Sequence, residues 1–199
     1  MALCSGAALA YAPAMEHIPD DCALMLRYQD GDVAAFETLY RRHNDPLFRY
    51  LLRLCRHRDA AEDVFQDVWG KIIKARASYR PTAKFNTFLY RVARNCFIDH
   101  LRRNKRHANL AELDAELHAH PGELPEALTE HSLAKERLSA ALLDLPDEQR
   151  DAFLLHEEAG LTLDQIAQVT NSNRETTKSR LRYANRKLRA AINEHEERR

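Results

Sequence analysis

Basic and hydroxyl side chains on one side of the predicted C-terminal helix are the residues in this sequence best suited to chemistry. Lys178, Ser179 and Arg182 lie opposite the apolar positions of that helix, so all three can point away from the core. Arginine carries a fork of N–H donors that can read the O6 and N7 atoms of guanine in the major groove. Three further arginines flank this face and suit phosphate groups: Arg174, Arg180 and Arg186. The pattern favours DNA binding, and a basic helical hairpin that binds no nucleic acid is the alternative.

A helix-turn-helix is the element that would present these side chains. Thr162 with Gln165 has the spacing of a capping box at the start of one helix, and Ser172 with Glu175 has it at the start of the next. Only residues 169–171 link the two helices, and so short a turn is typical of the motif. The last helix is predicted to bury Thr177, Leu181, Ala184 and Leu188.

A second candidate site interleaves aromatic and basic residues over positions 79–94. Aromatic rings stack on unpaired bases, while cations hold the phosphate backbone of a single strand. The members are Tyr79, Arg80, Lys84, Phe85, Phe88, Tyr90, Arg91 and Arg94. This composition favours a single-stranded nucleic-acid site. Phe85 and Phe88 are equally suited to a hydrophobic core, so spacing alone leaves both interpretations open.

A third group lies on a helix predicted over residues 59–73. Asp59 with Glu62 has the spacing of a capping-box variant, and an apolar stripe follows at helical spacing. A different face of the helix carries acid and amide groups: Asp63, Gln66 and Asp67. That polar face either contacts solvent alone or docks a basic partner.

No arrangement typical of an enzyme accompanies these groups. The sequence has no nucleophile elbow, no P-loop and no glycine-rich phosphate loop. His118 and His120 have no companion ligands, so we predict no catalysis, no cofactor and no metal site. Cys55 and Cys96 are interpreted as small core residues, with a redox switch as the less favoured alternative.

Composition and charge set the class of protein. Hydrophobic residues make up 45% of the 199 positions and only five are glycine, which favours an all-α fold. No apolar run approaches the roughly 20 residues that span a bilayer, so we expect no membrane insertion. The four cysteines show neither a CxxC pair nor zinc-ligand spacing and are interpreted as reduced thiols, so we expect a cytoplasmic location. The formal net charge of zero hides strong segregation. Residues 22–106 hold 18 Lys and Arg against 9 Asp and Glu, residues 107–170 hold 3 against 14, and residues 171–199 hold 9 against 4. Two basic blocks suggest two contacts with a polyanion.

The chain is predicted to form two small helical domains joined by a flexible linker. Within the first, Asp45-Pro46 is expected to begin a helix, because proline is favoured at the first helical position. The expected divisions are a leader over 1–21, a first domain over 22–106, an acidic linker over 107–131 and a second domain over 132–195.

Three segments, taken in order, resemble the sigma-70 family of RNA polymerase sigma factors, in its short extracytoplasmic-function (ECF) group. They are AEDVFQDVWGKII, FNTFLYRVARNCFIDHLRRNKR and LTLDQIAQVTNSNRETTKSRLRYANRKLR. The resemblance covers roughly residues 22–106, which are similar to sigma region 2, and 133–192, which are similar to region 4. It implies a protein that binds core RNA polymerase and directs promoter-specific initiation by recognising −10 and −35 elements, with no chemistry of its own.

The resemblance also implies roles for individual residues. The family's polymerase-binding helix matches 60–73, which implies that Asp63, Gln66 and Asp67 contact the polymerase clamp. Its reader of the −10 element matches the loop at 78–86 and the helix after it, which implies contacts by Tyr79, Arg80, Lys84, Phe88, Arg91 and Asn95. Its reader of the −35 element matches the last helix, which implies contacts by Arg174, Glu175, Lys178, Ser179, Arg182 and Arg186.

Departures from the family pattern leave the promoter sequence open. Phe88 stands where Trp is common, and Glu175 stands where Gly is frequent. Glu175 either accepts a hydrogen bond from a cytosine or only caps the helix. The implied partners are core RNA polymerase, promoter DNA and an anti-sigma factor. The alternative function is a stand-alone helix-turn-helix regulator, which would usually dimerise, although the sequence shows no second apolar stripe to form the dimer seam.

Overall fold

Helices make up every regular element in the described part of this computed structural model, which comprises residues 20–111 and 138–196. Most of the expected leader and most of the expected linker lie outside these ranges, and Asp21, which the prediction placed in the leader, begins the first helix. The α-helices are α1 (Asp21–Gln29), α2 (Val33–Cys55), α3 (Arg58–Ala75), α4 (Phe85–Ala111), α6 (Asp147–Glu157), α7 (Leu163–Thr170) and α8 (Arg174–Glu196), and a 3-10 turn, η1, covers Arg76–Ser78. Residues 138–143 are also helical. The all-α fold class is confirmed.

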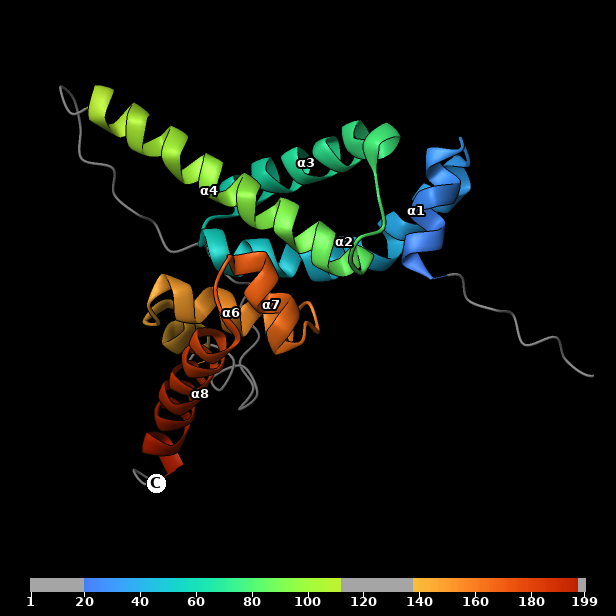
Figure 1. Cartoon of the computed structure of the whole chain (residues 1–199). Coiled ribbons are helices and arrows are strands. Elements are labelled where there is room, and N and C mark those ends of the chain that lie inside the picture. Colours follow the sequence, from blue (N-terminus) through green and yellow to red (C-terminus); the bar gives the residue numbers. More distant parts are fainter. Residues whose placement is uncertain (1–19, 112–137, 197–199) are drawn as a thin grey trace, which may run out of the picture.

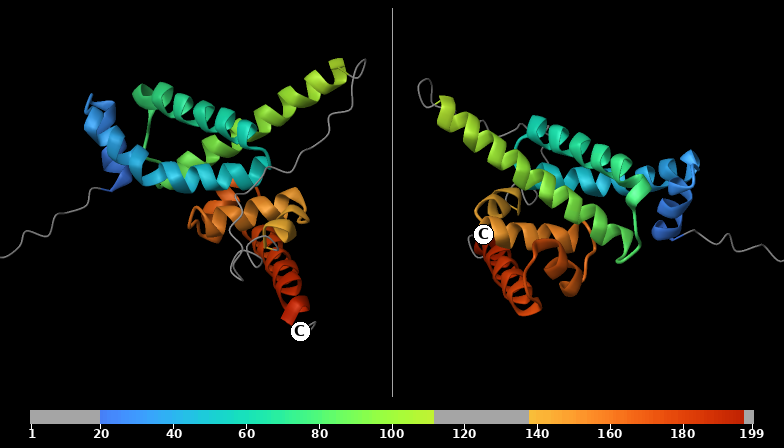
Figure 2. Two further views of the ribbon diagram at one scale, coloured as in Figure 1. Left: turned by 180° about the vertical axis from the view of Figure 1, so that it is seen from behind. Right: turned by 45° about the horizontal axis from the view of Figure 1, so that its top comes forward.

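The N-terminal domain, residues 20–111, is built from α1 to α4. Helix α3 packs against both α2 and α4, and α1 packs across α2 (Figure 1). Phe36, Tyr40 and Trp69 form an aromatic cluster between α2 and α3, with the Tyr40 and Trp69 ring centroids 4.8 Å apart. Helix α4 runs five residues past the expected end of the domain, and its C-terminal end projects beyond α2 and α3 in each view of Figure 2.

Pro46 lies inside α2 and does not begin a helix, contrary to the sequence prediction. Proline in a helix interior removes one hydrogen bond and costs about 3 kcal/mol. Leu39 and Leu47 are nevertheless both fully buried on this helix, as are Tyr50 and Leu51. Each buried side chain of this size contributes roughly 1.5–3 kcal/mol, so keeping them all on one continuous helix outweighs the cost of the proline.

The start of α3 also differs from the prediction. The helix begins at Arg58, its N-cap is His57, and the cap residue makes no side-chain hydrogen bond. Arg56, with a φ of 67°, reverses the chain just before it. Glu62 pairs with Arg58 at 2.8 Å instead of capping with Asp59.

The C-terminal domain, residues 138–196, contains the helix-turn-helix. The capping box of Thr162 and Gln165 is present at the start of α7, as predicted. Asn171, in the left-handed conformation with φ 51°, ends α7 and turns the chain. The cap of α8 differs from the prediction, because Asn173 and not Ser172 accepts the hydrogen bond from the backbone of Thr176, at 2.7 Å.

The two domains pack against each other. Helix α6 lies on α2, and α7 lies on α4, while α8 points away from the N-terminal domain (Figures 1 and 2). Buried apolar residues of both domains belong to one continuous core cluster, and a smaller cluster lies between residues 138–145 and α8.

Candidate nucleic-acid interface

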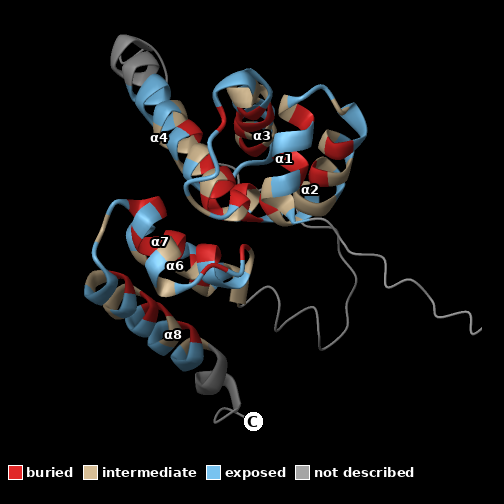
Figure 3. Ribbon diagram, turned by 45° about the vertical axis from the view of Figure 1, so that its right-hand side comes forward, coloured by how far each residue is buried: buried red, intermediate tan, exposed pale blue. Residues whose placement is uncertain are grey.

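The solvent face of α8 carries the residues predicted to read duplex DNA. Lys178, Arg182 and Arg186 are exposed, and Ser179 is half-buried. The opposite face is buried against α6 and α7, as Figure 3 shows, and it contains the four predicted core positions Thr177, Leu181, Ala184 and Leu188. The helix-turn-helix therefore leaves a row of cations, one turn apart, free to enter a groove.

Tyr183 is a residue of this face that the sequence prediction missed. Its half-exposed ring lies 5.3 Å from the guanidinium carbon of Arg182 and 5.0 Å from that of Arg186. A guanidinium at this distance from an aromatic face is attracted by about 0.5–1 kcal/mol at an exposed site. The position of Tyr183, one residue after Arg182 and three before Arg186, was the available signal in the sequence.

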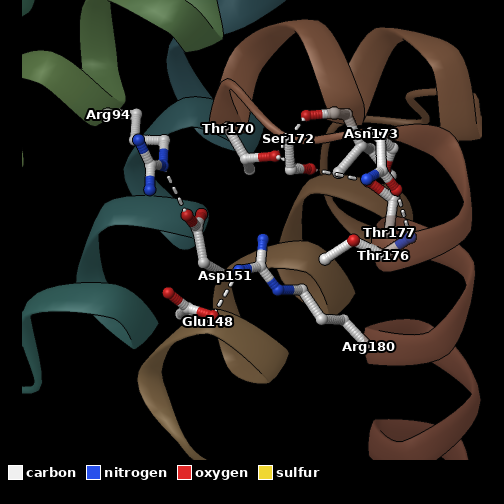
Figure 4. A network of polar contacts seen from close by, with 10 residues as sticks. Arg94, Glu148, Asp151, Thr170, Ser172, Asn173, Thr176, Thr177 and Arg180 are labelled. Carbon is white, nitrogen blue, oxygen red and sulfur yellow. Dashed lines mark hydrogen bonds and ion pairs between the residues drawn. The ribbon is translucent and has the colours of Figure 1, made fainter.

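Other charged residues of the motif are paired within the domain. Arg174 contacts Asp164 at 3.0 Å across the turn, and both side chains stay exposed. Glu175 lies 3.9 Å from Lys178, one turn further along α8. Arg180, expected beside the DNA face, instead points inward and pairs with Glu148 of α6 (Figure 4). It stabilises the packing of α8 on α6 and is not presented to a phosphate.

A polar network fixes the turn between α7 and α8. The Thr170 hydroxyl donates to the carbonyl of Ile166 and lies 2.9 Å from the Ser172 hydroxyl. Ser172 in turn lies 3.0 Å from the hydroxyl of Thr177 (Figure 4). Because these short side chains satisfy one another inside the turn, the angle between α7 and α8 is set by hydrogen bonds as well as by packing.

Tyr79 is placed differently from the expectation for a base-stacking residue. Only 4% of it is exposed, and its ring packs edge-on against Phe88 with the centroids 5.3 Å apart. Burial raises the pKa of its hydroxyl well above the ordinary value. Tyr79 therefore holds the loop from inside, and Phe85 is likewise core, at 1% exposure.

Tyr90 is also buried, at 1% exposure, whereas the other members of this site are at least partly accessible. Arg80 and Lys84 are exposed on the loop before α4, and Phe88 is half-buried. Arg91 and Asn95 are exposed and one turn apart on α4. The structure thus brings two polar side chains together on one helix face beside a cationic loop.

Two residues of α4 make contacts with the C-terminal domain: Asn86, for which the sequence predicted no role, and Arg94, which the sequence placed in the single-stranded nucleic-acid site. Asn86 donates to the backbone carbonyl of Ala159 at 2.6 Å. Arg94 donates to the carboxylate of Asp151 at 2.8 Å. Neither contact has a signal in the sequence, because the partners lie 73 and 57 residues further along the chain.

The polar face of α3 is shared with α4. Asp63 and Gln66 are exposed, whereas Asp67 accepts from Arg103 of α4 at 2.8 Å. A shallow pocket between the helices is lined by Asp63, Gln66, Asp67, His100, Arg103 and Asn104. Hydrogen bonding to Asp67 raises the pKa of the Arg103 guanidinium above its ordinary value. The pocket is therefore lined by both acidic and basic side chains and is not purely acidic.

Cys55 and Cys96 pack in the interior of the N-terminal domain. Cys96 is buried and Cys55 half-buried, and burial raises the pKa of the Cys55 thiol to about 12. A thiol with so high a pKa is a poor nucleophile, which disfavours a redox role for Cys55. Within the described ranges no three His, Cys, Asp or Glu side chains gather as metal ligands, and no helix is both long and apolar enough to cross a membrane. His118 and His120 lie outside those ranges.

Comparison with known proteins gives a consistent result for both domains. The family model described as Sigma-70 region 2 matches residues 39–107, and that described as Sigma-70, region 4 matches residues 141–190. Over 184 residues the chain is 30% identical to the ECF RNA polymerase sigma factor SigM of Mycobacterium tuberculosis, with 90% of each chain covered. Over 172 residues it is 30% identical to the RNA polymerase sigma factor CarQ of Myxococcus xanthus, covering 86% of this chain and 97% of that one.

Solved structures share the fold. The sigma factor RpoE of Bartonella quintana, in complex with the anti-sigma factor NepR, matches with a TM-score of 0.64 and 22% identity over 79% of this chain and 96% of its own. CnrH, in complex with the cytosolic domain of CnrY, matches with a TM-score of 0.62 and 20% identity over 87% of this chain and 97% of its own.

Two helical domains, the second carrying a helix-turn-helix, define a transcription-initiation protein of the sigma type. The chain belongs to the sigma-70 family, in its ECF group. It is a non-catalytic factor that binds core RNA polymerase and directs promoter-specific transcription.

Proposed function

We propose that this sigma factor reads the −35 element with α8, reads the −10 element with α4 and the loop before it, and docks on core polymerase through α3. The observation that carries the proposal is the exposed row of Lys178, Arg182 and Arg186 on a helix whose N-terminus is fixed by the helix-turn-helix. Arginine and lysine donors at this position can reach base edges and phosphates in the major groove. The protein would act in the cytoplasm, where polymerase and chromosome meet.

The −10 contact is assigned to exposed residues around a buried aromatic support. Arg91 and Asn95 would contact bases or backbone from one face of α4, while Arg80 and Lys84 would hold phosphates from the loop. Phe88 is half-buried and can stack on a base through its exposed edge. Tyr79 keeps the loop in place from below.

The polymerase contact is assigned to the hollow between α3 and α4. Asp63 and Gln66 offer free acceptors, and Asp67 offers a carboxylate already held in position by Arg103. Such a surface suits a partner that presents arginines or lysines together with at least one carboxylate.

An anti-sigma factor is a further proposed partner. Two proteins of the same fold are known in complexes, the sigma factor RpoE with the anti-sigma factor NepR and CnrH with the cytosolic domain of CnrY. We infer that this chain is held by a comparable protein until a signal releases it. Affinity purification of the tagged protein from uninduced cells should recover such a partner at a stoichiometric ratio.

Reconstituted transcription separates this function from the alternative of a stand-alone regulator. Purified protein is mixed with core polymerase and genomic DNA, and run-off products are mapped. Discrete start sites that need both components support the proposal. A protein that binds specific DNA tightly without polymerase, and directs no initiation with it, is a regulator instead.

A further inference from the structure

Helix α1 contacts the loop that precedes α4, which carries two of the cations assigned to the −10 element. The chain between α3 and α4 passes beside α1 in Figures 1 and 2. Gln29 donates from its side-chain amide to the backbone carbonyl of Ala77 at 2.9 Å and to that of Tyr79 at 3.5 Å. The thiol of Cys22 donates to the carbonyl of Ala83 at 3.6 Å, a weaker bond. Helix α1 therefore holds the loop at both of its ends.

The spacing of Cys22 and Gln29 places both side chains on one face of α1. Seven residues separate them, which is two turns of an α-helix and a rise of roughly 10 Å. The side-chain amide of Gln29 has two N–H donors, which match the two carbonyls that it contacts. Arg76 of η1 adds a bond in the opposite direction, because its guanidinium donates to the backbone carbonyl of Gln29 at 3.4 Å.

Helix α1 is itself fixed to the rest of the N-terminal domain. Asp21 pairs with Arg42 and with His43 of α2, each at 2.7 Å. Its apolar face is buried in the core through Leu24, Met25 and Tyr28. The helix is therefore a firm support, and a side chain that reaches from it to the loop fixes the loop relative to α2 and α4.

The bonds that the loop makes within itself are local. The backbone N–H of Thr82 donates to the carbonyl of Arg80 at 2.8 Å, and the Arg80 side chain donates to the carbonyl of Tyr79 at 3.0 Å. Bonds between residues one or two positions apart shape a turn but do not place it relative to α4. The buried ring of Tyr79 fixes one end of the loop, and the contacts from α1 add a second fixed point at Ala83. The backbone that carries Arg80 and Lys84 is thus held between two supported ends.

We propose that α1 is part of the −10 site and that Gln29 and Cys22 are positioning residues, which hold the loop so that Arg80 and Lys84 meet the DNA in one geometry. The inference rests on the proposed function. A supported backbone loses less freedom on binding and directs each long side chain to particular nucleotides. Loosening the loop should weaken engagement of the favoured −10 sequence and leave poorly matched sequences almost unchanged, so discrimination among −10 sequences should fall.

The test compares the full-length wild type with the double variant Gln29→Met/Cys22→Ala, which removes the donors and keeps an unbranched side chain at position 29. Gln29→Met alone is the milder variant and replaces the double variant if that protein does not fold. Cys22→Ser keeps a donor and is the conservative comparison. The matched control is Ala23→Met, which introduces the same side chain at an exposed position of α1.

Three measurements are made on each variant. The melting temperature reports the stability of the free protein, and hydrogen–deuterium exchange of peptides covering residues 77–84 reports how firmly the loop is held. Transcription by the holoenzyme from promoter libraries randomised separately at −10 and at −35 reports sequence preference at each element.

The double variant is expected to exchange the loop amides faster while its melting temperature stays near that of the wild type. Its discrimination among −10 sequences should fall roughly fivefold, the size expected for the loss of hydrogen bonds of this kind, and its −35 preference should not change. Gln29→Met alone should show the same changes to a smaller extent. Cys22→Ser should lie close to the wild type, and Ala23→Met should match it in all three measurements.

Unchanged exchange of the loop in the double variant overturns the proposal, and so does faster exchange without any loss of −10 preference. A lower melting temperature with reduced output from both libraries and unchanged preference would show a purely structural role, which also overturns it. Arg80→Ala/Lys84→Ala tests the proposed function separately. If removing both cations leaves −10 preference intact, the proposed function fails at this loop, and the exchange measurement still decides whether α1 holds it.

Discussion

Arg182 and Arg186 lie one turn apart on α8, and both guanidinium groups contact the ring of Tyr183. A single aromatic residue thus restrains two exposed arginines that we propose contact DNA. Fewer rotamers have to be lost when such side chains bind, which favours directional contacts over diffuse attraction. The contact with Tyr183 therefore tells more about how these arginines can bind than their residue type alone does.

Loss of Arg182 should change which −35 sequences are read. If its fork binds a guanine, Arg182→Ala should cost roughly 1–3 kcal/mol and relax preference at one base pair. Arg186→Ala is the comparison, because a phosphate contact should weaken all sequences alike and reduce the salt slope by about one unit. The measurement is binding of holoenzyme to −35 variants at several salt concentrations. Equal effects of the two substitutions on every sequence would contradict the assignment of Arg182 to a base.

Tyr79 should matter first to stability. Truncating a buried aromatic side chain usually costs about 3–5 kcal/mol, so Tyr79→Ala should unfold the protein at a clearly lower urea concentration. Tyr79→Phe keeps the ring and its contact with Phe88, and it should stay close to the wild type. If Tyr79→Ala were as stable as the wild type and defective only in −10 recognition, the ring would be a DNA contact after all.

The packing of the helices determines which face of each helix is exposed to a partner. Helix α8 presents its cations because α7 and the polar turn hold it at one angle, and α3 presents its polar face because α2 and α4 cover the other sides. Asn173, the N-cap residue of α8, lies in the turn and also accepts a hydrogen bond from the backbone of the first turn of the helix. Its loss should therefore be felt in stability and in DNA reading together.

Asn173→Ala removes the side chain that accepts from the Thr176 backbone. Loss of an N-cap of this kind costs about 1 kcal/mol, which should lower the melting temperature by a few degrees. Asn173→Asp, which can still cap, should restore most of the stability. A melting temperature that is unchanged in Asn173→Ala would show that the turn is held by Ser172 and its neighbours alone.

Charge reversal on α3 should separate folding from polymerase binding. Asp63→Arg with Asp67→Arg alters exposed or half-buried positions, and surface ion pairs such as Asp67–Arg103 contribute only about 0–1 kcal/mol. The variant should keep its helical circular dichroism and bind core polymerase much more weakly. Asp59→Arg, an exposed position on the same helix, is the control. Normal binding by the double variant would move the docking surface elsewhere.

The charges of the whole molecule are segregated in the sequence into two basic blocks, residues 22–106 and 171–199, with an acidic block, residues 107–170, between them. In the folded chain, Glu158 and Asp151 of the acidic block form ion pairs with arginines of the N-terminal domain. Arg91 and Arg182 are both exposed, yet they belong to different domains and are assigned to different promoter elements.

Because the two proposed contacts lie on separate domains, their effects on promoter choice should be independent. Arg182→Ala should alter preference only in a library randomised at −35, and Arg91→Ala only in one randomised at −10. The assay is transcription by the holoenzyme from each library, followed by sequencing of the products. A change in −10 preference caused by Arg182→Ala would contradict the division of labour between the domains.

Much of this protein could be predicted from local sequence patterns. Helical periodicity, the Thr162–Gln165 capping box and the buried face of α8 are decided by residues three or four positions apart, which one helix brings together. The same local logic predicted the exposed cations of α8 and the polar face of α3. It failed at Pro46, where packing on α3 and α4 outweighed a local preference of the chain.

Only the tertiary structure decided which polar groups meet across long distances in the sequence. Tyr79 became a core residue because α4 folds back over the loop that carries it, and Arg180 turned inward because Glu148 of α6 lies beneath it. Asp151 reads in the sequence as an ordinary helix carboxylate, yet it is buried between Tyr50 and Arg94, 101 and 57 residues earlier in the chain. Sequence periodicity cannot predict these contacts of Asp151, because they depend on how the two domains pack against each other.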